Sequence, residues 1–278
     1  MIDFTEREVL TRILNEYGLR LEKSLGQHFL VDKEDLVAMV EAADINSEDT
    51  VVEIGTGIGT LTQELCQQAG KVIAYEMDAR VAKVVREKIL PQYNNLELIV
   101  GDFLKEELPL GGLFKVVSNL PYQITTPAIR RFLESGLLPS KMVVMVQKEV
   151  AERLSAKPGS AKRGWVTILV ELFGRAQISR FIPAEHFFPR PKVASAILII
   201  DDIRQPTDID VSACLKVVKA GFSQKRRQLI NSLAGGLHLE PAKIREILFK
   251  AQIDPKLRAE DLDTIQWKSL TNTMKDLS

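Results

Sequence analysis

Val51-Val-Glu-Ile-Gly-Thr-Gly-Ile-Gly-Thr-Leu-Thr62 joins a short apolar strand to a glycine-rich turn and the start of a helix. Glycines at the carboxyl end of a first strand let the backbone approach a ligand closely and turn sharply into a helix. The spacing is G-x-G-x-G, which differs from the G-x-G-x-x-G of dinucleotide binders. This stretch predicts a ligand-binding turn, although alone it also fits a tight turn that binds nothing.

Apolar runs of strand length recur along the chain around this turn. Segments with helical periodicity separate the first five runs, which predicts a parallel sheet covered by helices on both faces. The last two runs lack such a separator, so we expect an antiparallel pair at one edge. The sequence therefore predicts a doubly wound α/β sheet of about seven strands. The runs are Val51–Ile54, Val72–Tyr75, Leu96–Val100, Val116–Ser118, Met142–Val146, Thr167–Phe173 and Ala194–Ile200.

A polar segment with a proline, residues 201–210, follows the last run and predicts a linker. Only helical patterns follow it. We therefore expect a large domain over residues 1–205 and a small helical domain over residues 206–278.

Bulk composition excludes several classes of protein. The net charge of the 278 residues is zero, so an interaction with nucleic acid must rest on local basic patches. Cys66 and Cys214 are too few and too far apart for a disulfide framework or a zinc site, and we expect no metal. No charge-free apolar run approaches the roughly 18 residues that span a bilayer. The absence of a signal peptide predicts a cytoplasmic protein without a membrane partner.

Acidic residues end the next two predicted strands. Glu76 follows the second strand, where a carboxylate can accept hydrogen bonds from both hydroxyls of a ribose. Asp102 follows the third and can accept a hydrogen bond from an adenine amino group, with Phe103 packed against the base. Because ligands bind at the carboxyl ends of such strands, Gly55, Glu76 and Asp102 together resemble the cofactor site of class I S-adenosylmethionine methyltransferases with a Rossmann-like sheet.

The fourth strand ends in Asn119-Leu120-Pro121-Tyr122. The lone pair of an adenine N6 amine is delocalised into the ring, so the amine is a poor nucleophile. The Asn119 side-chain carbonyl and the Leu120 main-chain carbonyl can each accept one N6 hydrogen, which frees the lone pair without a general base. Tyr122 offers a face on which an extruded base stacks. The motif predicts N6 methylation of adenine, and cytosine C5 chemistry is excluded because neither cysteine follows a proline.

Two other stretches are candidates for contact with nucleic acid. Phe187 begins a proline-stiffened loop and would close the second side of the target base. Lys225, Arg226 and Arg227 place three positive charges at the expected start of a helix, where they could neutralise phosphates. The basic residues of the loop 157–163 are a weaker candidate of the same kind, since charged runs are usually solvated surface.

Together these motifs resemble the ribosomal RNA adenine dimethyltransferases, in particular the KsgA/RsmA branch, with the Erm enzymes as relatives. The similarity extends from about Lys23 to Leu262. Its markers are G-Q-H-F-L at 26–30, E-I-G-T-G-I-G-T-L-T at 53–62, N-L-P-Y at 119–122, F-F-P-R-P-K-V at 187–193, F-S-Q-K-R-R-Q-L-I-N-S-L at 222–233 and R-A-E-D-L at 258–262.

The resemblance implies cofactor contacts from His28, Leu30, Gly55, Glu76, Asp102 and Asn119. It implies a clamp on the target base formed by Asn119, Tyr122 and Phe187. His28 stands where the family usually has asparagine; it can still donate a hydrogen bond, but a positive charge on it would disfavour a cationic sulfonium.

The resemblance also implies the reaction. The product is N6,N6-dimethyladenosine at two adjacent adenines in the 3′-terminal hairpin loop of small-subunit (16S) rRNA, made by a monomer on an assembling subunit. Two alternatives stay open, namely an Erm-like 23S rRNA methyltransferase and a catalytically silent ribosome-assembly factor.

Overall fold

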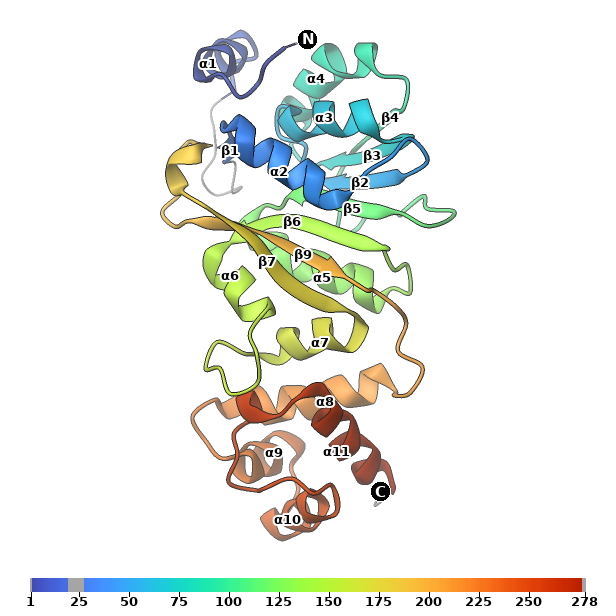
Figure 1. Cartoon of the computed structure of the whole chain (residues 1–278), viewed down its shortest axis with the longest axis vertical. Coiled ribbons are helices and arrows are strands. Elements are labelled where there is room, and N and C mark those ends of the chain that lie inside the picture. Colours follow the sequence, from blue (N-terminus) through green and yellow to red (C-terminus); the bar gives the residue numbers. More distant parts are fainter. Residues whose placement is uncertain (1, 20–27, 277–278) are drawn as a thin grey trace. The chain divides into compact units, whose positions relative to one another are not determined.

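The computed structural model describes residues 2–19 and 28–276, and Figure 1 shows their helices and strands. By its internal contacts the chain forms two compact units. The first consists of Met1–Ala151 and Gln177–Ile203, and the second of Glu152–Ala176 and Arg204–Ser278.

A seven-stranded sheet lies at the centre of the first unit. Its strands are β2 (Thr50–Ile54), β3 (Lys71–Glu76), β4 (Leu96–Val100), β5 (Lys115–Asn119), β6 (Lys141–Gln147), β7 (Arg175–Ile182) and β9 (Ser195–Asp201). They are arranged in the order β4-β3-β2-β5-β6-β9-β7, in which the pairs from β4 to β6 are parallel and β9 is antiparallel to β6. The strand order reverses beside β2, and open α/β sheets bind their ligands outside the carboxyl ends of strands at such a point.

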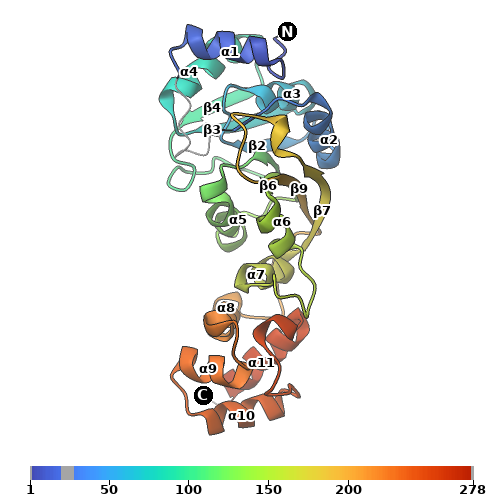
Figure 2. The same ribbon diagram turned by 90° about the vertical axis from the view of Figure 1, so that its left-hand side faces the viewer.

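Helices cover both faces of this sheet (Figure 1, Figure 2). One face packs against α2 (Lys33–Ala43), α3 (Thr60–Gln68) and α4 (Ala79–Lys88), whose buried apolar residues share one core with the strands. The opposite face is covered by α5 (Thr125–Glu134), where the ring of Phe132 lies 5.3 Å from that of Phe103. The other helices among the described residues of the first unit are α1 (Arg7–Glu16), the start of α6 (Lys148–Leu154) and the short η2 (Leu90–Gln92), η3 (Tyr122–Ile124) and η4 (Ala184–His186).

A separate two-stranded sheet joins the start of the chain to the proline-stiffened loop. Strand β1 (Phe29–Leu30) pairs antiparallel with β8 (Phe187–Phe188), with Phe29 opposite Phe188 and Leu30 opposite Phe187. This pairing brings together two motifs that are about 160 residues apart in the sequence.

The expected strand at Thr167–Phe173 is wrong, because these residues belong to helix α7 (Trp165–Phe173). A short run that is apolar on all sides fits a buried helix as well as a buried strand. The backbone N–H of Gly164 donates to Thr167 Oγ1 at 3.0 Å and satisfies one free donor at the helix start. The strand at the sheet edge is β7, whose side chains are mostly exposed.

The segment between β4 and β5 also differs from the prediction. Residues 101–114 contain turns but no helix, although helical periodicity was expected between all of the first five strands. Helices do separate the other consecutive pairs, and the prediction of about seven strands in an α/β sheet is confirmed.

The second unit is helical. It contains α7, α8 (Val211–Gly221), α9 (Leu229–Leu237), α10 (Pro241–Lys250) and α11 (Thr264–Asp276), with the short η5 (Phe222–Gln224) and η6 (Ala259–Asp261). Its core holds the fully buried Trp267, stacked on Phe222 with ring centroids 5.9 Å apart. No helix among the described residues combines the length and the apolar character needed to cross a membrane.

The second unit is larger than the predicted domain 206–278, because it includes Glu152–Ala176. The buried Arg163 explains why this segment belongs with the helices. Its guanidinium donates to Glu171 Oε1 at 2.6 Å and to the carbonyl oxygen of Leu262 at 3.2 Å. The chain enters the second unit for the last time at Arg204, close to the predicted division near residue 205, and the earlier segment Glu152–Ala176 has no counterpart in the prediction.

Candidate active site

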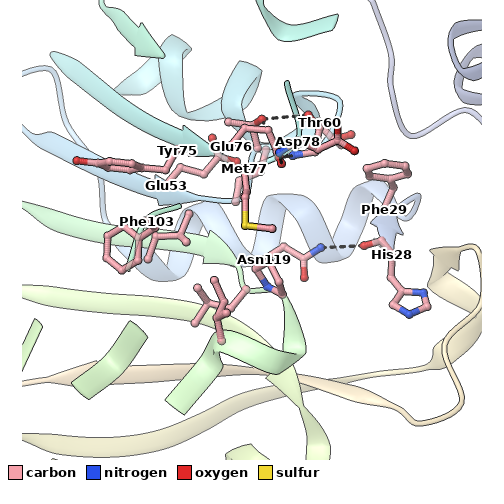
Figure 3. Close-up of a pocket in the computed structure, with 18 of the residues that line it drawn as sticks. His28, Phe29, Glu53, Thr60, Tyr75, Glu76, Met77, Asp78, Phe103 and Asn119 are labelled. Atoms are coloured by element: carbon pink, nitrogen blue, oxygen red, sulfur yellow. Dashed lines mark hydrogen bonds between the residues drawn. The ribbon is translucent and has the colours of Figure 1, made fainter. Parts of the chain in front are cut away.

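A cavity at the carboxyl ends of β2, β3, β4 and β5 brings most of the predicted site together (Figure 3). Its lining includes the predicted residues His28, Leu30, Gly55, Glu76, Asp102, Asn119, Leu120 and Tyr122. Residues from five separate stretches of sequence thus meet in one place. Four of these stretches lie at the carboxyl ends of β2, β3, β4 and β5, and the fifth, His28–Leu30, contains β1. Gly26 and Gln27 of the first motif lie outside the described residues.

The glycine-rich turn adopts backbone angles that favour glycine. Gly55 has φ +79° and Gly57 has φ +53°, and a Cβ on Gly57 would lie 2.7 Å from the Phe29 ring. The backbone N–H of Gly57 donates to Glu76 Oε2 at 2.9 Å. Glu76 therefore holds the turn against β3 in addition to facing the cavity.

Glu76 can still bind a ligand in this arrangement. Its other oxygen accepts a hydrogen bond from the Asp78 N–H at 3.0 Å. Oε1 has a second lone pair for a ligand hydroxyl, whereas Oε2 also faces Thr56 Oγ1 at 3.4 Å, a long contact that a second ligand hydroxyl can replace. Burial raises the pKa of Glu76, against the opposing effect of its two backbone hydrogen bonds.

Glu53 is a cavity residue to which the sequence pattern gave no role. It is 1% exposed, and its Oε2 has no hydrogen-bond partner among the described residues. Burial raises the pKa of Glu53 to about 8, with a further contribution from the nearby charge of Glu76. An acidic residue inside the otherwise apolar run Val51–Ile54 was the signal in the sequence. A cation in the cavity would stabilise the ionised form of both carboxyl groups.

Asp102, Phe103 and Met77 line another part of the cavity. Asp102 Oδ1 accepts a hydrogen bond from the Leu104 N–H at 3.0 Å, which fixes the turn after β4. Phe103 packs edge-on against Tyr75, with ring centroids 5.3 Å apart. Met77 also lines the cavity and is 59% exposed, so it offers an apolar surface to a flat ligand. Met77 was not predicted as a site residue, because one methionine after a strand carries no distinctive signal.

The side chain of Asn119 has a defined orientation (Figure 3). Its Nδ2 donates to the carbonyl oxygen of His28 at 3.1 Å. A carbonyl oxygen only accepts, so the atom facing it must be the amide nitrogen. Asn119 Oδ1 is therefore left as the acceptor on the cavity side.

His28 connects the cavity to the proline-stiffened loop. Its Nδ1 lies 2.7 Å from the Pro189 carbonyl oxygen, so this nitrogen carries the proton and donates. The imidazole stacks on Tyr122, with ring centroids 5.6 Å apart and an interplanar angle of 25°. The His28 side chain thus faces the proline-stiffened loop at Pro189, whereas a contact with the cofactor was predicted for it.

Tyr122 is anchored by its hydroxyl group. The oxygen lies 2.8 Å from Ser195 Oγ, at the start of β9. Burial raises the pKa of Tyr122, partly offset by this hydrogen bond. The phenol is therefore neutral near pH 7, and its ring position is fixed by the sheet.

Phe187 does not line the cavity, in contrast to the prediction that it meets Asn119 and Tyr122. It is 1% exposed, because the pairing of β8 with β1 turns its side chain into the apolar core. Its part in holding a target base stays a prediction.

The predicted basic patch lies in the second unit. Lys225, Arg226 and Arg227 are exposed in the turn between η5 and α9, just before the helix rather than in its first turn. None of these three side chains forms an ion pair with a described carboxylate. In the loop 157–163, by contrast, Arg163 is buried and Lys162 pairs with Glu152 at 2.8 Å. The prediction that Arg163 contacts phosphates is therefore wrong.

Comparison with known proteins agrees with this arrangement. The chain matches the family model described as Ribosomal RNA adenine dimethylase over residues 18–276. It belongs to the ribosomal RNA adenine dimethylase family. Ribosomal RNA small subunit methyltransferase A from Halothermothrix orenii is 40% identical over 274 residues, covering 94% of this chain and 91% of that protein. The protein of the same name from Geobacillus kaustophilus is 38% identical, with coverage of 95% and 94%.

Two solved structures have the same fold as this chain. A dimethyladenosine transferase from Plasmodium falciparum is similar with a TM-score of 0.76 and 26% identity, covering 88% of this chain and 96% of that one. The 23S rRNA methyltransferase ErmE is similar with a TM-score of 0.69 and 26% identity, covering 89% and 99%. The predicted family and the class I methyltransferase fold are confirmed.

A substitution at Gly57 tests the glycine-rich turn of this dimethylase. We expect Gly57→Ala to weaken binding of S-adenosylhomocysteine by about tenfold or more, because the new Cβ collides with Phe29 and strains a left-handed backbone. Isothermal titration calorimetry measures the affinity. Gly136→Ala is the matched control, since Gly136 also has positive φ but no atom lies within 4 Å of its added Cβ. Equal losses in both variants would contradict a specific role for the turn.

Proposed function

We propose that this protein is an S-adenosylmethionine-dependent rRNA adenine N6-dimethyltransferase that acts as a monomer on assembling small ribosomal subunits. Its targets are two adjacent adenines in the 3′-terminal hairpin loop of 16S rRNA. The observation that carries the proposal is the orientation of Asn119, whose amide nitrogen is tied to His28 and whose oxygen is free for an amine hydrogen.

The cavity fits S-adenosylmethionine on two grounds. Glu53 and Thr60 line the cavity, and the described part of the chain provides no hydrogen-bond partner for the buried Glu53 Oε2 or Thr60 Oγ1, so a bound ligand can supply one. Gly55 and Gly57 line the cavity with positive-φ backbone and no side chain, so a ligand can approach the main chain closely there. We assign Glu76 to the ribose hydroxyls and Asp102 to the adenine amino group, with Gly55, Leu30 and the His28 segment completing the site. The bound cofactor supplies a methyl group that its sulfonium charge makes electrophilic.

The protein's own groups activate the acceptor. Asn119 Oδ1 and the Leu120 carbonyl oxygen each accept one hydrogen of the adenine N6 amine. These bonds favour a tetrahedral nitrogen, whose lone pair is then localised and directed away from both acceptors. No side chain has to remove a proton before the transfer, because the acidified amine loses it afterwards to water.

Tyr122 holds the extruded base by stacking, which contributes about 1–3 kcal/mol in comparable complexes. In the present structure the His28 ring stacks on Tyr122. We assign the closing of the other face of the base to Phe187, as the family resemblance implies, and this role requires its buried side chain to turn out of the core when the base enters.

One observation favours the small subunit over an Erm-like target, and another favours an enzyme over a silent assembly factor. The similar curated proteins at 38–40% identity are named for the small subunit and match nearly the whole chain. A catalytically silent assembly factor would not require the Asn119 and Tyr122 geometry, which is intact here.

Nucleoside mass spectrometry of rRNA from cells that lack the gene tests this function. We expect dimethyladenosine to disappear from the small subunit and to return when the gene is restored. Unchanged dimethyladenosine in the deletion strain would refute the proposal, and loss from the large subunit instead would favour the Erm-like alternative.

The basic patch carries a separate prediction. We expect Lys225/Arg226/Arg227→Ala to weaken RNA binding by about 10- to 100-fold at low salt. The slope of log affinity against log salt should fall by about 2 to 3, as expected when three phosphate contacts are lost. S-adenosylhomocysteine affinity should not change. Filter binding across a salt series measures both RNA quantities.

The control for this triple variant is Lys243/Arg245/Lys250→Ala on α10, which removes the same charge from the same unit. If this control weakens binding equally, the effect comes from net charge and the assignment of the patch to RNA is wrong.

A further inference from the structure

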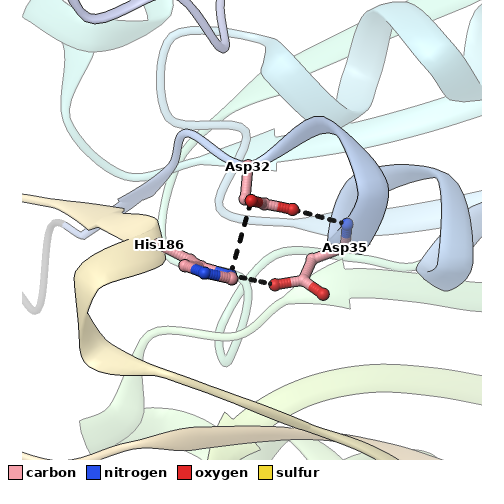
Figure 4. A group of neighbouring side chains, drawn as sticks. All are labelled: Asp32, Asp35 and His186. Carbon is pink, nitrogen blue, oxygen red and sulfur yellow. Dashed lines mark hydrogen bonds and ion pairs between the residues drawn. The ribbon is translucent and has the colours of Figure 1, made fainter.

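Two histidines bracket the short sheet of β1 and β8. At one end His28 Nδ1 donates to the Pro189 carbonyl oxygen at 2.7 Å. At the other, the Val31 N–H donates to the His186 carbonyl oxygen at 2.8 Å. His186 Nδ1 in turn lies 2.6 Å from Asp35 Oδ2, on the first turn of α2 (Figure 4). We call this set, His28–Pro189 together with His186–Asp35, the histidine clasp.

The two strands need such support. An isolated two-stranded ladder is marginal in water even when a tight turn joins its strands, and here the strands are far apart in the sequence. Asp35 is 1% exposed, so its hydrogen bond to His186 is shielded from solvent. Asp32 caps α2 by accepting from the Asp35 N–H at 3.0 Å and lies 3.5 Å from His186 Nδ1.

The cluster of Asp32, Asp35 and His186 has the residue types of a metal site, but its bonds identify it as an ion-pair network. Arg180 Nε lies 3.2 Å from Asp35 Oδ1. Because His186 Nδ1 contacts Asp35 Oδ2, both oxygens of the buried Asp35 carboxylate already face donors. The positive charge of Arg180 takes the place that a cation would otherwise fill.

We propose that His186 is a positioning residue for Asn119. The connection is a continuous series of bonds: His186 fixes β8 against α2, β8 pairs with β1, and the His28 carbonyl that precedes β1 accepts the Asn119 amide hydrogen. Loosening the clasp frees that carbonyl and lets the amide of Asn119 rotate. The effect of His186 on the rate of methylation rests on the proposed function. The histidine clasp itself does not, because it can be measured in the protein without any substrate.

Three substitutions at His186 test the clasp. His186→Leu removes the donor to Asp35. His186→Gln keeps a polar group of similar size but places its amide near the position of Nε2, so it also loses the hydrogen bond to Asp35. This variant disturbs the packing less and replaces His186→Leu in the test if the leucine variant does not fold. His186→Asn restores an N–H near the position of Nδ1. The control is Glu34→Gln, because Glu34 neighbours Asp35 and contacts Arg180 at 3.8 Å but is exposed.

Hydrogen exchange of segments 28–32 and 186–190 reports the clasp without any substrate. We expect exchange to accelerate about tenfold or more in His186→Leu and His186→Gln, and to stay near wild type in His186→Asn and Glu34→Gln. Unchanged exchange in the leucine and glutamine variants, or no recovery with asparagine, would overturn the clasp.

Single-turnover methylation with both substrates saturating reports the positioning. We expect the rate to fall about 10- to 100-fold in His186→Leu and His186→Gln and to recover in His186→Asn, with S-adenosylhomocysteine affinity within about threefold throughout. Faster exchange with an unchanged rate would mean that the clasp is structural only. If the wild-type protein methylates no small-subunit RNA, the proposed function fails while the exchange result still decides the clasp.

Discussion

Asn119→Ala is expected to lower the rate of methyl transfer by about a thousandfold while the affinity for S-adenosylhomocysteine changes less than about threefold. Removing one prearranged hydrogen-bonding group from a reacting centre costs about this much in rate. The cofactor keeps Glu53, Glu76, Asp102 and the glycine-rich turn, none of which depends on the Asn119 side chain. Single-turnover assays on unmethylated small subunits measure the rate, and calorimetry measures the affinity.

Asn119→Asp separates the two functions of this amide. The carboxylate still offers an acceptor to the adenine amine, but it cannot donate to the His28 carbonyl oxygen and is repelled by it. We expect this variant to be slow as well, because the acceptor is no longer held in place. An alanine variant that retains more than about a tenth of the wild-type rate would contradict the role of Asn119.

Glu53→Gln is expected to stabilise the cofactor-free protein by about 3 kcal/mol at pH 7. Burial raises the pKa of Glu53 from its ordinary 4.5 to about 8, so the folded protein holds a proton that the unfolded chain releases at neutral pH. Folding then requires proton uptake. Glutamine has a similar shape and stays neutral in both states, so it removes this cost.

The sign of the pH dependence follows from the raised pKa. In the wild type, the contribution of Glu53 to the free energy of unfolding is fully present below pH 4.5, falls as the pH rises, and levels off above about pH 8. The gain from Glu53→Gln should therefore be near zero at pH 4.5 and largest above pH 8. Urea unfolding across this range measures it, with the exposed Glu41→Gln as control. A gain that does not vary with pH would contradict the buried, protonated state of Glu53.

The same substitution should weaken the binding of the cofactor. A cation in the cavity favours the ionised form of Glu53, whereas glutamine cannot ionise. We therefore expect Glu53→Gln to bind S-adenosylmethionine less tightly although the free protein is more stable. Such an opposition between stability and binding is typical of functional sites.

The sequence predicted the parts of the site that depend on topology. Gly55, Glu76, Asp102 and Asn119 each follow a predicted strand, and the carboxyl ends of parallel strands meet at one edge of a sheet. Alternating helices and strands were sufficient for the sheet itself. The errors fell where a local pattern is ambiguous, as at Thr167–Phe173, whose uniformly apolar run is a buried helix. The exposed edge strand β7 has little apolar alternation and was missed.

Contacts between distant segments could not be predicted from the residues alone. The bond from Asn119 to the His28 carbonyl joins residues 91 apart, and the pairing of His186 with Asp35 joins residues 151 apart. The burial of Phe187 depends on its pairing with Leu30, and the burial of Arg163 on Glu171. The charge state of Glu53 likewise depends on packing around it, because a carboxyl group titrates normally when solvated.

This cavity is proposed to convert adenine to N6,N6-dimethyladenine in small-subunit rRNA. The most direct test of this proposal incubates the purified protein with labelled S-adenosylmethionine and small subunits that lack the modification, followed by nucleoside mass spectrometry. We expect two dimethyladenosines per subunit, both in the 3′-terminal hairpin, and none in large subunits treated in parallel. Label confined to the large subunit, or no dimethyladenosine from a protein that binds the cofactor, would contradict it.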